Sequence, residues 1–193
     1  MEIIQENIWA TPIWFTDIPF DIINPNEMLE DCYEYKKNNE GADMPQYKAW
    51  TSNNLISNIP KNTKKLISKI EEICNNTAIH YNAKNLNPKC LDAWFSINYP
   101  GGFISPHIHR HGPFSAVYYL KAPLNSGNLY FINTSSSTHF NKVYLNNEGI
   151  NNAEMVQYET KPGRLIIFPS WLIHTTPLNL SDEDRVSFGI DLG

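Results

Sequence analysis

The spacing of the apolar residues changes near residue 90 of this chain. Before that point they recur every three or four positions, as on one face of an α-helix. The clearest stretch runs from about Thr63 to Tyr81, and its apolar face consists of Leu66, Ile67, Ile70, Ile73, Cys74, Thr77 and Ala78. An earlier helix is expected to begin near Asn24-Pro25, where a capping residue precedes a proline that fits a first helical turn. The first half of the chain therefore predicts helices.

From Leu91 onward apolar and polar residues alternate, and proline and glycine separate short runs rich in aromatic and β-branched residues. This pattern predicts eight strands: Leu91–Tyr99, Phe103–His109, Ser115–Leu120, Asn128–Asn133, Met155–Glu159, Arg164–Phe168, Leu172–Pro177 and Arg185–Asp191. Short strands without intervening helices favour an antiparallel sandwich or jelly roll, so the fold class is α+β but mainly β. The 193 residues suit a single domain, 1–193, in which residues 1–90 give N-terminal helical support and residues 91–193 form a jelly-roll core.

Composition and charge exclude several functions. The formal net charge is −5, which argues against a nucleic-acid partner because phosphate binding needs clustered lysine and arginine. No apolar run is long enough for a membrane span, and the acidic, polar start does not resemble a secretion signal. The three cysteines form no CxxC pair, so reduced thiols are expected. These features together predict a soluble cytoplasmic protein without nucleic-acid or membrane partners.

The histidines offer the main candidate chemistry. His107 and His109 are two residues apart on a predicted strand, so both side chains are expected on one face of it. Such a pair alone is weak support for a metal site, because two histidines can also lie on a wet sheet face. His174 follows in a distant apolar segment, and Arg185 begins the next predicted strand. Three imidazoles from separate elements could therefore complete a metal-binding face.

Five segments and His174 occur in the order found in a known family. They are Tyr99–His109, Val117–Leu120, Ser126–Phe131, Pro162–Pro169 and Arg185–Phe188. In these segments the sequence resembles the 2-oxoglutarate and Fe(II)-dependent oxygenases, in particular their prolyl-hydroxylase-like branch. The resemblance covers roughly the C-terminal half. It implies a double-stranded β-helix, a cupin-like jelly roll, with residues 91–193 as the catalytic core.

The resemblance also implies roles for individual residues. His107, His109 and His174 would be the catalytic metal ligands that hold Fe(II), leaving room for O2 and for 2-oxoglutarate as co-substrate. The remote carboxylate of 2-oxoglutarate needs a cation, and the planar fork of Arg185 suits it. Ser187 lies on the same face of that strand.

Strand parity adds two further cofactor-binding candidates. Tyr119 matches a family position from which a tyrosine hydroxyl reaches the same carboxylate, and Ser115 shares its side of the strand. Tyr118 is expected to face outward. His111 continues the period-two series, but Gly112-Pro113 should end the strand and leave it at the rim.

One residue departs from the family pattern. Most members carry a carboxylate two residues after the first histidine, whereas this chain has His109. Three neutral ligands leave the charge of the iron uncompensated by the protein, which should strengthen its attraction for a dianionic co-substrate. The departure is compatible with activity, but it leaves open whether the metal is iron.

The predicted function is therefore a dioxygenase that hydroxylates an unknown small-molecule or peptide substrate and releases succinate and CO2 from 2-oxoglutarate. One alternative is a cupin-like three-histidine metalloenzyme that does not use 2-oxoglutarate, although such an enzyme would not need Arg185. Another is a non-catalytic jelly-roll binding module. Among the aromatic residues, Trp94 and Trp171 are expected in the core, as aromatics on strands usually are. The oligomeric state is not predicted.

Overall fold

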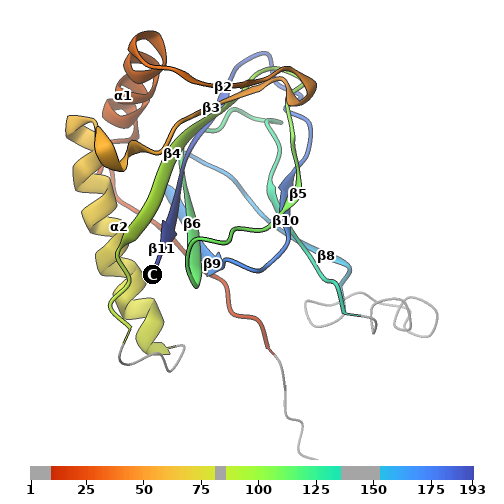
Figure 1. The fold of residues 1–193 in the computed structure, drawn as a ribbon. Helices are drawn as coiled ribbons and strands as arrows, with labels where there is room; N and C mark the ends of the chain where they lie inside the picture. Colours follow the sequence, from red (N-terminus) through yellow and green to blue (C-terminus); the bar gives the residue numbers. More distant parts are fainter. Residues whose placement is uncertain (1–9, 81–85, 136–152) are drawn as a thin grey trace, which may run out of the picture.

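A computed structural model describes residues 10–80, 86–135 and 153–193 (Figure 1). Two helices, α1 (Pro25–Asn38) and α2 (Lys61–His80), lie against the outer face of a β-structure. Two short 3-10 turns, η1 (Pro45–Tyr47) and η2 (Leu55–Ser57), lie between the two helices along the chain. Both predicted helices are confirmed, although Tyr81 lies outside the described residues. Neither described helix has the length and apolar character that a membrane crossing requires.

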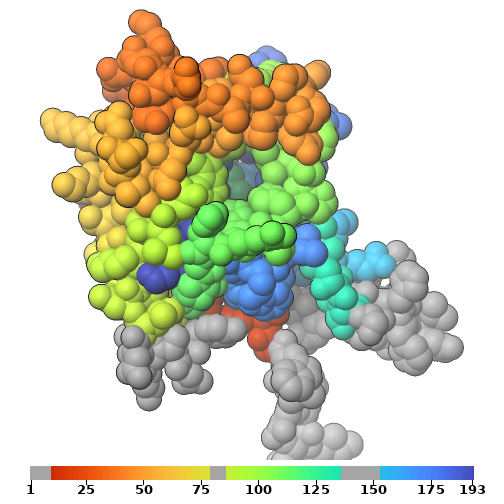
Figure 2. Space-filling model, in the orientation of Figure 1, coloured from red at the N-terminus to blue at the C-terminus, as the bar shows by residue number. Residues whose placement is uncertain are grey.

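The strands form two antiparallel sheets that face each other. The larger sheet has the order β1 (Trp14–Asp17), β9 (Arg164–Pro169), β6 (Phe114–Lys121), β11 (Arg185–Leu192), β4 (Cys90–Asn98), β3 (Ala49–Ser52) and β2 (Gly41–Met44). The smaller sheet has the order β5 (Ile104–His107), β10 (His174–Thr176), β7 (Leu129–Ile132) and β8 (Met155–Tyr158). This arrangement confirms the predicted jelly roll. Figure 2 shows a hollow on one face of it, between the orange segment that includes β2 and the green strands below.

All eight predicted strands are present, but within the described ranges the sequence pattern misses three others. β1, β2 and β3 each have four residues, and runs that short do not show a clear period of two. They belong to the half predicted to give helical support, yet they pair with β9 and β4 of the jelly-roll core. Residues 1–90 are therefore partly strand, and the two predicted parts of the domain share one sheet.

Local side-chain contacts explain where the helices begin. The side-chain oxygen of Asn24 accepts a hydrogen bond from the backbone N–H of Asn26 at 3.0 Å, and Pro25 follows the cap. The start of α2 is capped from α1, because the Asp31 carboxylate accepts from the backbone N–H groups of Asn62 and Thr63 at 3.1 and 3.0 Å. The same carboxylate therefore caps one helix and ties it to the other.

The alternation along β11 separates the core from the interior of the jelly roll. Val186, Phe188, Ile190 and Leu192 are fully buried in the cluster between the larger sheet and the helices. The intervening residues, Arg185, Ser187, Gly189 and Asp191, lie on the opposite face of the strand, toward the smaller sheet. This second row contains a cation at one end of the strand and a carboxylate at the other.

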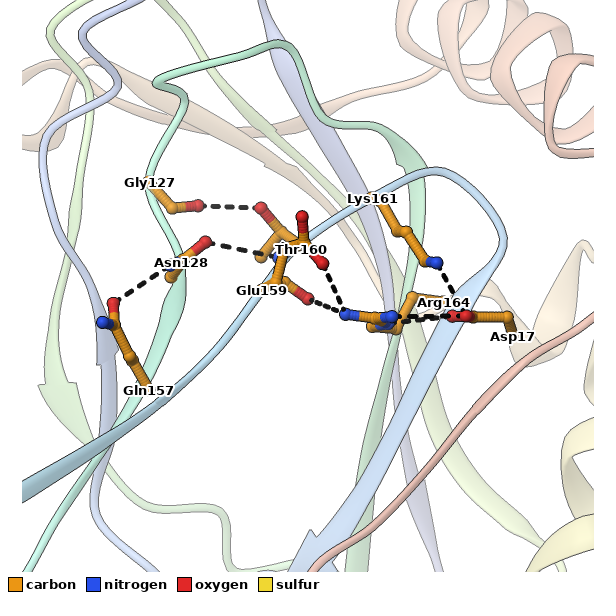
Figure 3. A network of polar contacts seen from close by, with 8 residues as sticks. All are labelled: Asp17, Gly127, Asn128, Gln157, Glu159, Thr160, Lys161 and Arg164. Carbon is orange, nitrogen blue, oxygen red and sulfur yellow. Dashed lines mark hydrogen bonds and ion pairs between the residues drawn. The ribbon is translucent and has the colours of Figure 1, made fainter.

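A small ionic network joins β1 to the segment before β9 (Figure 3). Arg164 is paired with Asp17 at 2.8 Å and with Glu159 at 3.2 Å, and Lys161 contacts Asp17 at 2.7 Å. Nearby, the hydroxyl of Thr160 donates to the backbone carbonyl of Gly127 at 2.9 Å. The network thus connects the edge strand β1 to the loop before β7.

Asp17 predicts a pH-dependent contribution to stability. Its hydrogen bond with Arg164 lowers the pKa of Asp17 from 3.8 to about 2 in the folded protein. The carboxylate therefore stabilises the fold above the unfolded pKa, and this contribution is lost as the pH falls toward 2. Because the side chain is 46% exposed, the effect should stay below about 1 kcal/mol. Asp17→Asn is expected to lower the free energy of unfolding at neutral pH, and denaturant titrations should show this difference vanishing near pH 2.

Candidate metal centre

Three histidines converge between the two sheets. His107 is the last residue of β5 and His174 the first of β10, and the two are directly paired across these antiparallel strands. His109 lies two residues beyond the end of β5, where its backbone N–H donates to the carbonyl of Ser170 at 2.9 Å. One ring nitrogen from each histidine lies within 4.8 Å of the others. The structure therefore brings together the three predicted ligands, although only two of them are on strands.

Hydrogen bonds fix which ring nitrogen of His107 and His174 is free. Nδ1 of His107 lies 2.8 Å from the carbonyl oxygen of Ser105, and Nδ1 of His174 lies 3.0 Å from that of Leu172. A carbonyl oxygen only accepts, so each Nδ1 carries the proton and each Nε2 keeps its lone pair. A lone pair at Nε2 is what a bound metal requires.

Burial keeps two of the imidazoles neutral. Burial, together with the nearby His107, lowers the pKa of His174 to about 3. Burial also lowers the pKa of His107 from its ordinary value of 6.5. Both rings are therefore uncharged at neutral pH, which is the form that coordinates metals.

A cavity of about 300 Å³ opens beside the histidines. Besides them, its lining includes Met44, Tyr47, Thr51, Trp94, Ser96, Asn98, Ile104, Ser105, Ala116, Val117, Tyr119, Leu129, Phe168, Thr175, Thr176, Arg185, Ser187 and Gly189. The first three come from the segment of β2, η1 and β3, which the sequence pattern does not predict as strand. This segment also borders the hollow seen in Figure 2.

Arg185 brings a buried positive charge to the same cavity. Only 2% of its surface is exposed, and its guanidinium donates to the carbonyls of Ser126 and Gly127 and to the hydroxyl of Thr176. Burial lowers the pKa of this guanidinium, which nevertheless keeps its proton throughout the neutral range. No carboxylate of the described residues forms an ion pair with it. A buried cation without a counter-ion is costly, so the position is suited to an anionic ligand.

Tyr119 supplies a second group for such a ligand. It is 1% exposed, and among the described side chains its hydroxyl has no hydrogen-bond partner. Burial raises the pKa of this phenol, so it is a neutral donor. Tyr119 pairs in register with Ser187, and both line the cavity with Arg185. The three side chains predicted to bind one carboxylate therefore share one wall.

Other predictions need correction. Ser115 does not line the cavity beside Arg185; its hydroxyl is fully buried and bonds to Asp191 and Ser170 at 2.6 and 2.8 Å. Tyr118 faces away from the cavity as expected, but it is buried under the helices because they cover that side of the sheet.

Aromatic and rim residues also differ from expectation. Trp171 is 56% exposed rather than in the core, since it lies in the turn before β10. Trp94 lines the cavity, with its ring 5.2 Å from that of His109. His111 is exposed and lies outside the histidine cluster, in agreement with its predicted place at the rim.

Sequence reasoning misses the residues that hold the predicted ones. Gly127 has a φ of +92°, and a Cβ there would lie 2.9 Å from the Arg185 guanidinium, so the close approach requires glycine. Thr176 follows His174 by two residues, and strand parity could have placed it in the cavity. Asp191 ends the row that Arg185 begins, and the same parity argument applies to it.

The donor groups fit a divalent transition metal beside a carboxylate-bearing ligand. Imidazole nitrogens suit iron and its neighbours in the first transition series, and three of them leave further coordination positions for small ligands. The unpaired guanidinium and the unbonded phenol would together receive a carboxylate. Both groups line the same cavity as the histidines.

Comparisons with known proteins agree with this chemistry. Residues 92–191, more than half of the chain, match the family described as "Putative 2OG-Fe(II) oxygenase". No curated protein matches the sequence.

Solved structures share the fold at low sequence identity. A prolyl-4-hydroxylase from Pseudomonas putida is 14% identical, with a TM-score of 0.66, over 94% of this chain and 92% of that one. The non-heme alpha-ketoglutarate-dependent epimerase SnoN of nogalamycin biosynthesis is 13% identical, with a TM-score of 0.68, over 93% and 75%. HygX from Streptomyces hygroscopicus, solved with nickel and 2-oxoglutarate, is 11% identical, with a TM-score of 0.58, over 95% and 83%. These similarities show the fold.

Proposed function

The chain belongs to the family of putative 2OG-Fe(II) oxygenases, and from this we propose that it hydroxylates an unactivated C–H bond while converting 2-oxoglutarate to succinate and CO2. Its cofactor is Fe(II), and its co-substrates are 2-oxoglutarate and O2. One observation carries the proposal: the three-histidine cluster and the unpaired Arg185 line a single cavity. The substrate is proposed to be a small molecule or a peptide side chain.

His107, His109 and His174 would hold the iron, which when bound supplies the activation of O2. Their part is to present nitrogen donors from three fixed positions. Hydrogen bonds from Nδ1 orient all three rings before a metal arrives, and this reduces the reorganisation that binding requires.

Arg185 and Tyr119 would bind the carboxylate of 2-oxoglutarate that is remote from the metal. The guanidinium is already held by two backbone carbonyls and by Thr176, so it keeps its orientation without an anion. Ser187, beside Tyr119 in the register, can donate a third hydrogen bond. Buried and partly desolvated, these donors should bind an anion more strongly than they would in water.

Arg185 is also what separates this function from its alternatives. A three-histidine enzyme whose ligands carry no anionic group gains nothing from a buried cation without a counter-ion. A carboxylate-bearing co-substrate that also binds the metal accounts for the cation and the three histidines together.

Succinate formation tests the proposal directly. Purified protein is incubated with labelled 2-oxoglutarate, with and without Fe(II) and O2, in the presence of pooled small molecules and peptides. Labelled succinate is expected only when Fe(II), O2 and 2-oxoglutarate are all present, and a chelator should abolish its formation. Protein that binds metal but neither binds 2-oxoglutarate nor forms succinate would contradict the proposal and favour the cupin-like alternative.

A further inference from the structure

A buried carboxylate lies directly behind one of the three histidines. Asp191, near the end of β11, is 2% exposed. Its Oδ1 lies 2.6 Å from Nδ1 of His109 and also accepts a hydrogen bond from the hydroxyl of Ser115 at 2.6 Å. Among the described residues, no lysine or arginine forms an ion pair with Asp191. His109 is therefore the basic side chain that this carboxylate contacts.

The other two histidines are supported differently. His107 and His174 each donate from Nδ1 to the neutral backbone carbonyl two residues earlier in the chain. Only His109 has a carboxylate in that place. It is also the residue that stands where the resembling family usually has a carboxylate ligand. None of the three candidate metal ligands is a carboxylate. A carboxylate, that of Asp191, instead accepts a hydrogen bond from one of them.

We propose that Asp191 is a positioning residue that acts on the metal through His109 and compensates for the absent carboxylate ligand. By accepting the Nδ1 proton it fixes His109 with Nε2 toward the metal and strengthens that nitrogen as a donor. The inference rests on the proposed function, because it requires a metal among the three histidines.

The surroundings of His109 are built for this contact. Ser115 bonds to Asp191 and also to the hydroxyl of Ser170, whose backbone carbonyl accepts the N–H of His109. On the other side the Trp94 ring lies 5.2 Å from the imidazole, and a Cβ on Gly189 would collide with that ring. The imidazole is therefore held by its backbone, by an aromatic ring and by a carboxylate.

The carboxylate is kept at this position at a cost. Asp92 of β4 stands directly opposite Asp191 in the register, and like charges in that relation destabilise a sheet. An asparagine at 191 could accept the same two hydrogen bonds without this repulsion. The two hydrogen bonds alone therefore do not require a carboxylate at this position, whereas a metal bound to His109 would favour one.

Asp191→Asn tests the proposal, with Asp92→Asn as the matched control. Both variants remove one negative charge from neighbouring positions on the same face, but only the first contacts His109. Affinity for Co(II), measured by calorimetry without 2-oxoglutarate, is expected to fall by ~10- to 100-fold in Asp191→Asn. In Asp92→Asn it should change far less. The ligand-field absorption of bound Co(II) should also shift in Asp191→Asn, which a purely structural role would not cause.

The possible outcomes distinguish a failure of this inference from a failure of the proposed function on which it rests. Wild-type protein that binds no Co(II) would overturn the proposed function. Wild-type binding with equal affinity and an unchanged spectrum in Asp191→Asn would overturn the role of Asp191 alone. Equal losses of Co(II) affinity in both variants would also overturn it, because affinity would then depend on nearby negative charge in general and not on the contact between Asp191 and His109.

A second measurement covers the case in which Asp191→Asn does not fold. His109→Gly leaves space for free imidazole, which can donate to Asp191, whereas N-methylimidazole cannot. Imidazole is expected to restore Co(II) binding better than N-methylimidazole at equal concentration. Equal restoration by the two ligands would overturn the proposal.

Discussion

Replacement of His174 by alanine is expected to abolish succinate formation. The same change should weaken Co(II) binding by more than about 100-fold, since losing even an outer hydrogen-bond partner of a ligand typically costs ~10- to 100-fold. His174 is buried, and its ring centroid lies 4.2 Å from that of His107. No other described histidine lies close enough to replace it. Calorimetry with Co(II) and the labelled succinate assay measure the two effects independently.

His111→Ala is the matched control for this experiment. His111 shares the period-two spacing of His107 and His109, but it is exposed and lies outside the cluster. Its replacement should leave metal affinity and succinate formation unchanged. Circular dichroism of metal-free His174→Ala establishes that the variant is folded. Retention of wild-type metal affinity in folded His174→Ala would place the metal elsewhere.

The period-two pattern was sufficient to predict much of this site. Alternation along β6 and β11 is a local property, so it could place Tyr119, Arg185 and Ser187 on the inner face without knowledge of the fold. For His107 and His109 the same argument correctly predicts that the two side chains converge, but it does not explain what positions His109. His109 lies beyond the strand, and its direction is set by Ser170 and Asp191 instead.

The contacts that the sequence could not predict depend on register. Ser115 was expected beside Arg185 because it shares the parity of Tyr119, but parity does not say how far along the strand a side chain lies. The pairing of β6 with β11 places Ser115 opposite Asp191, at the end of the strand remote from Arg185. Two strands that border the cavity, β2 and β3, were not predicted for another reason, since they are too short to show a period of two.

Arg185→Gln is expected to raise the KM for 2-oxoglutarate strongly. Removing one partner of a buried, hydrogen-bonded charge pair typically costs about 2–5 kcal/mol, which corresponds to roughly 30- to 5000-fold. Arg185→Lys should recover only part of this loss, because an ammonium keeps the charge but not the planar fork that matches a carboxylate. Co(II) binding without 2-oxoglutarate should be unaffected in both variants, since the hydrogen bonds of the Arg185 guanidinium go to Ser126, Gly127 and Thr176 and not to the three histidines.

Thermal unfolding separates a binding role of Arg185 from a structural one. Wild-type protein is expected to gain stability when 2-oxoglutarate is added with Co(II), because the anion binds the folded state and neutralises a buried cation. Without 2-oxoglutarate, Arg185→Gln is expected to have a lower Tm than wild type, because the buried guanidinium donates to Ser126, Gly127 and Thr176 and these acceptors lose their donor. Its Tm should then fail to rise with 2-oxoglutarate. A Tm that rises in Arg185→Gln as in wild type would mean that another group binds the remote carboxylate.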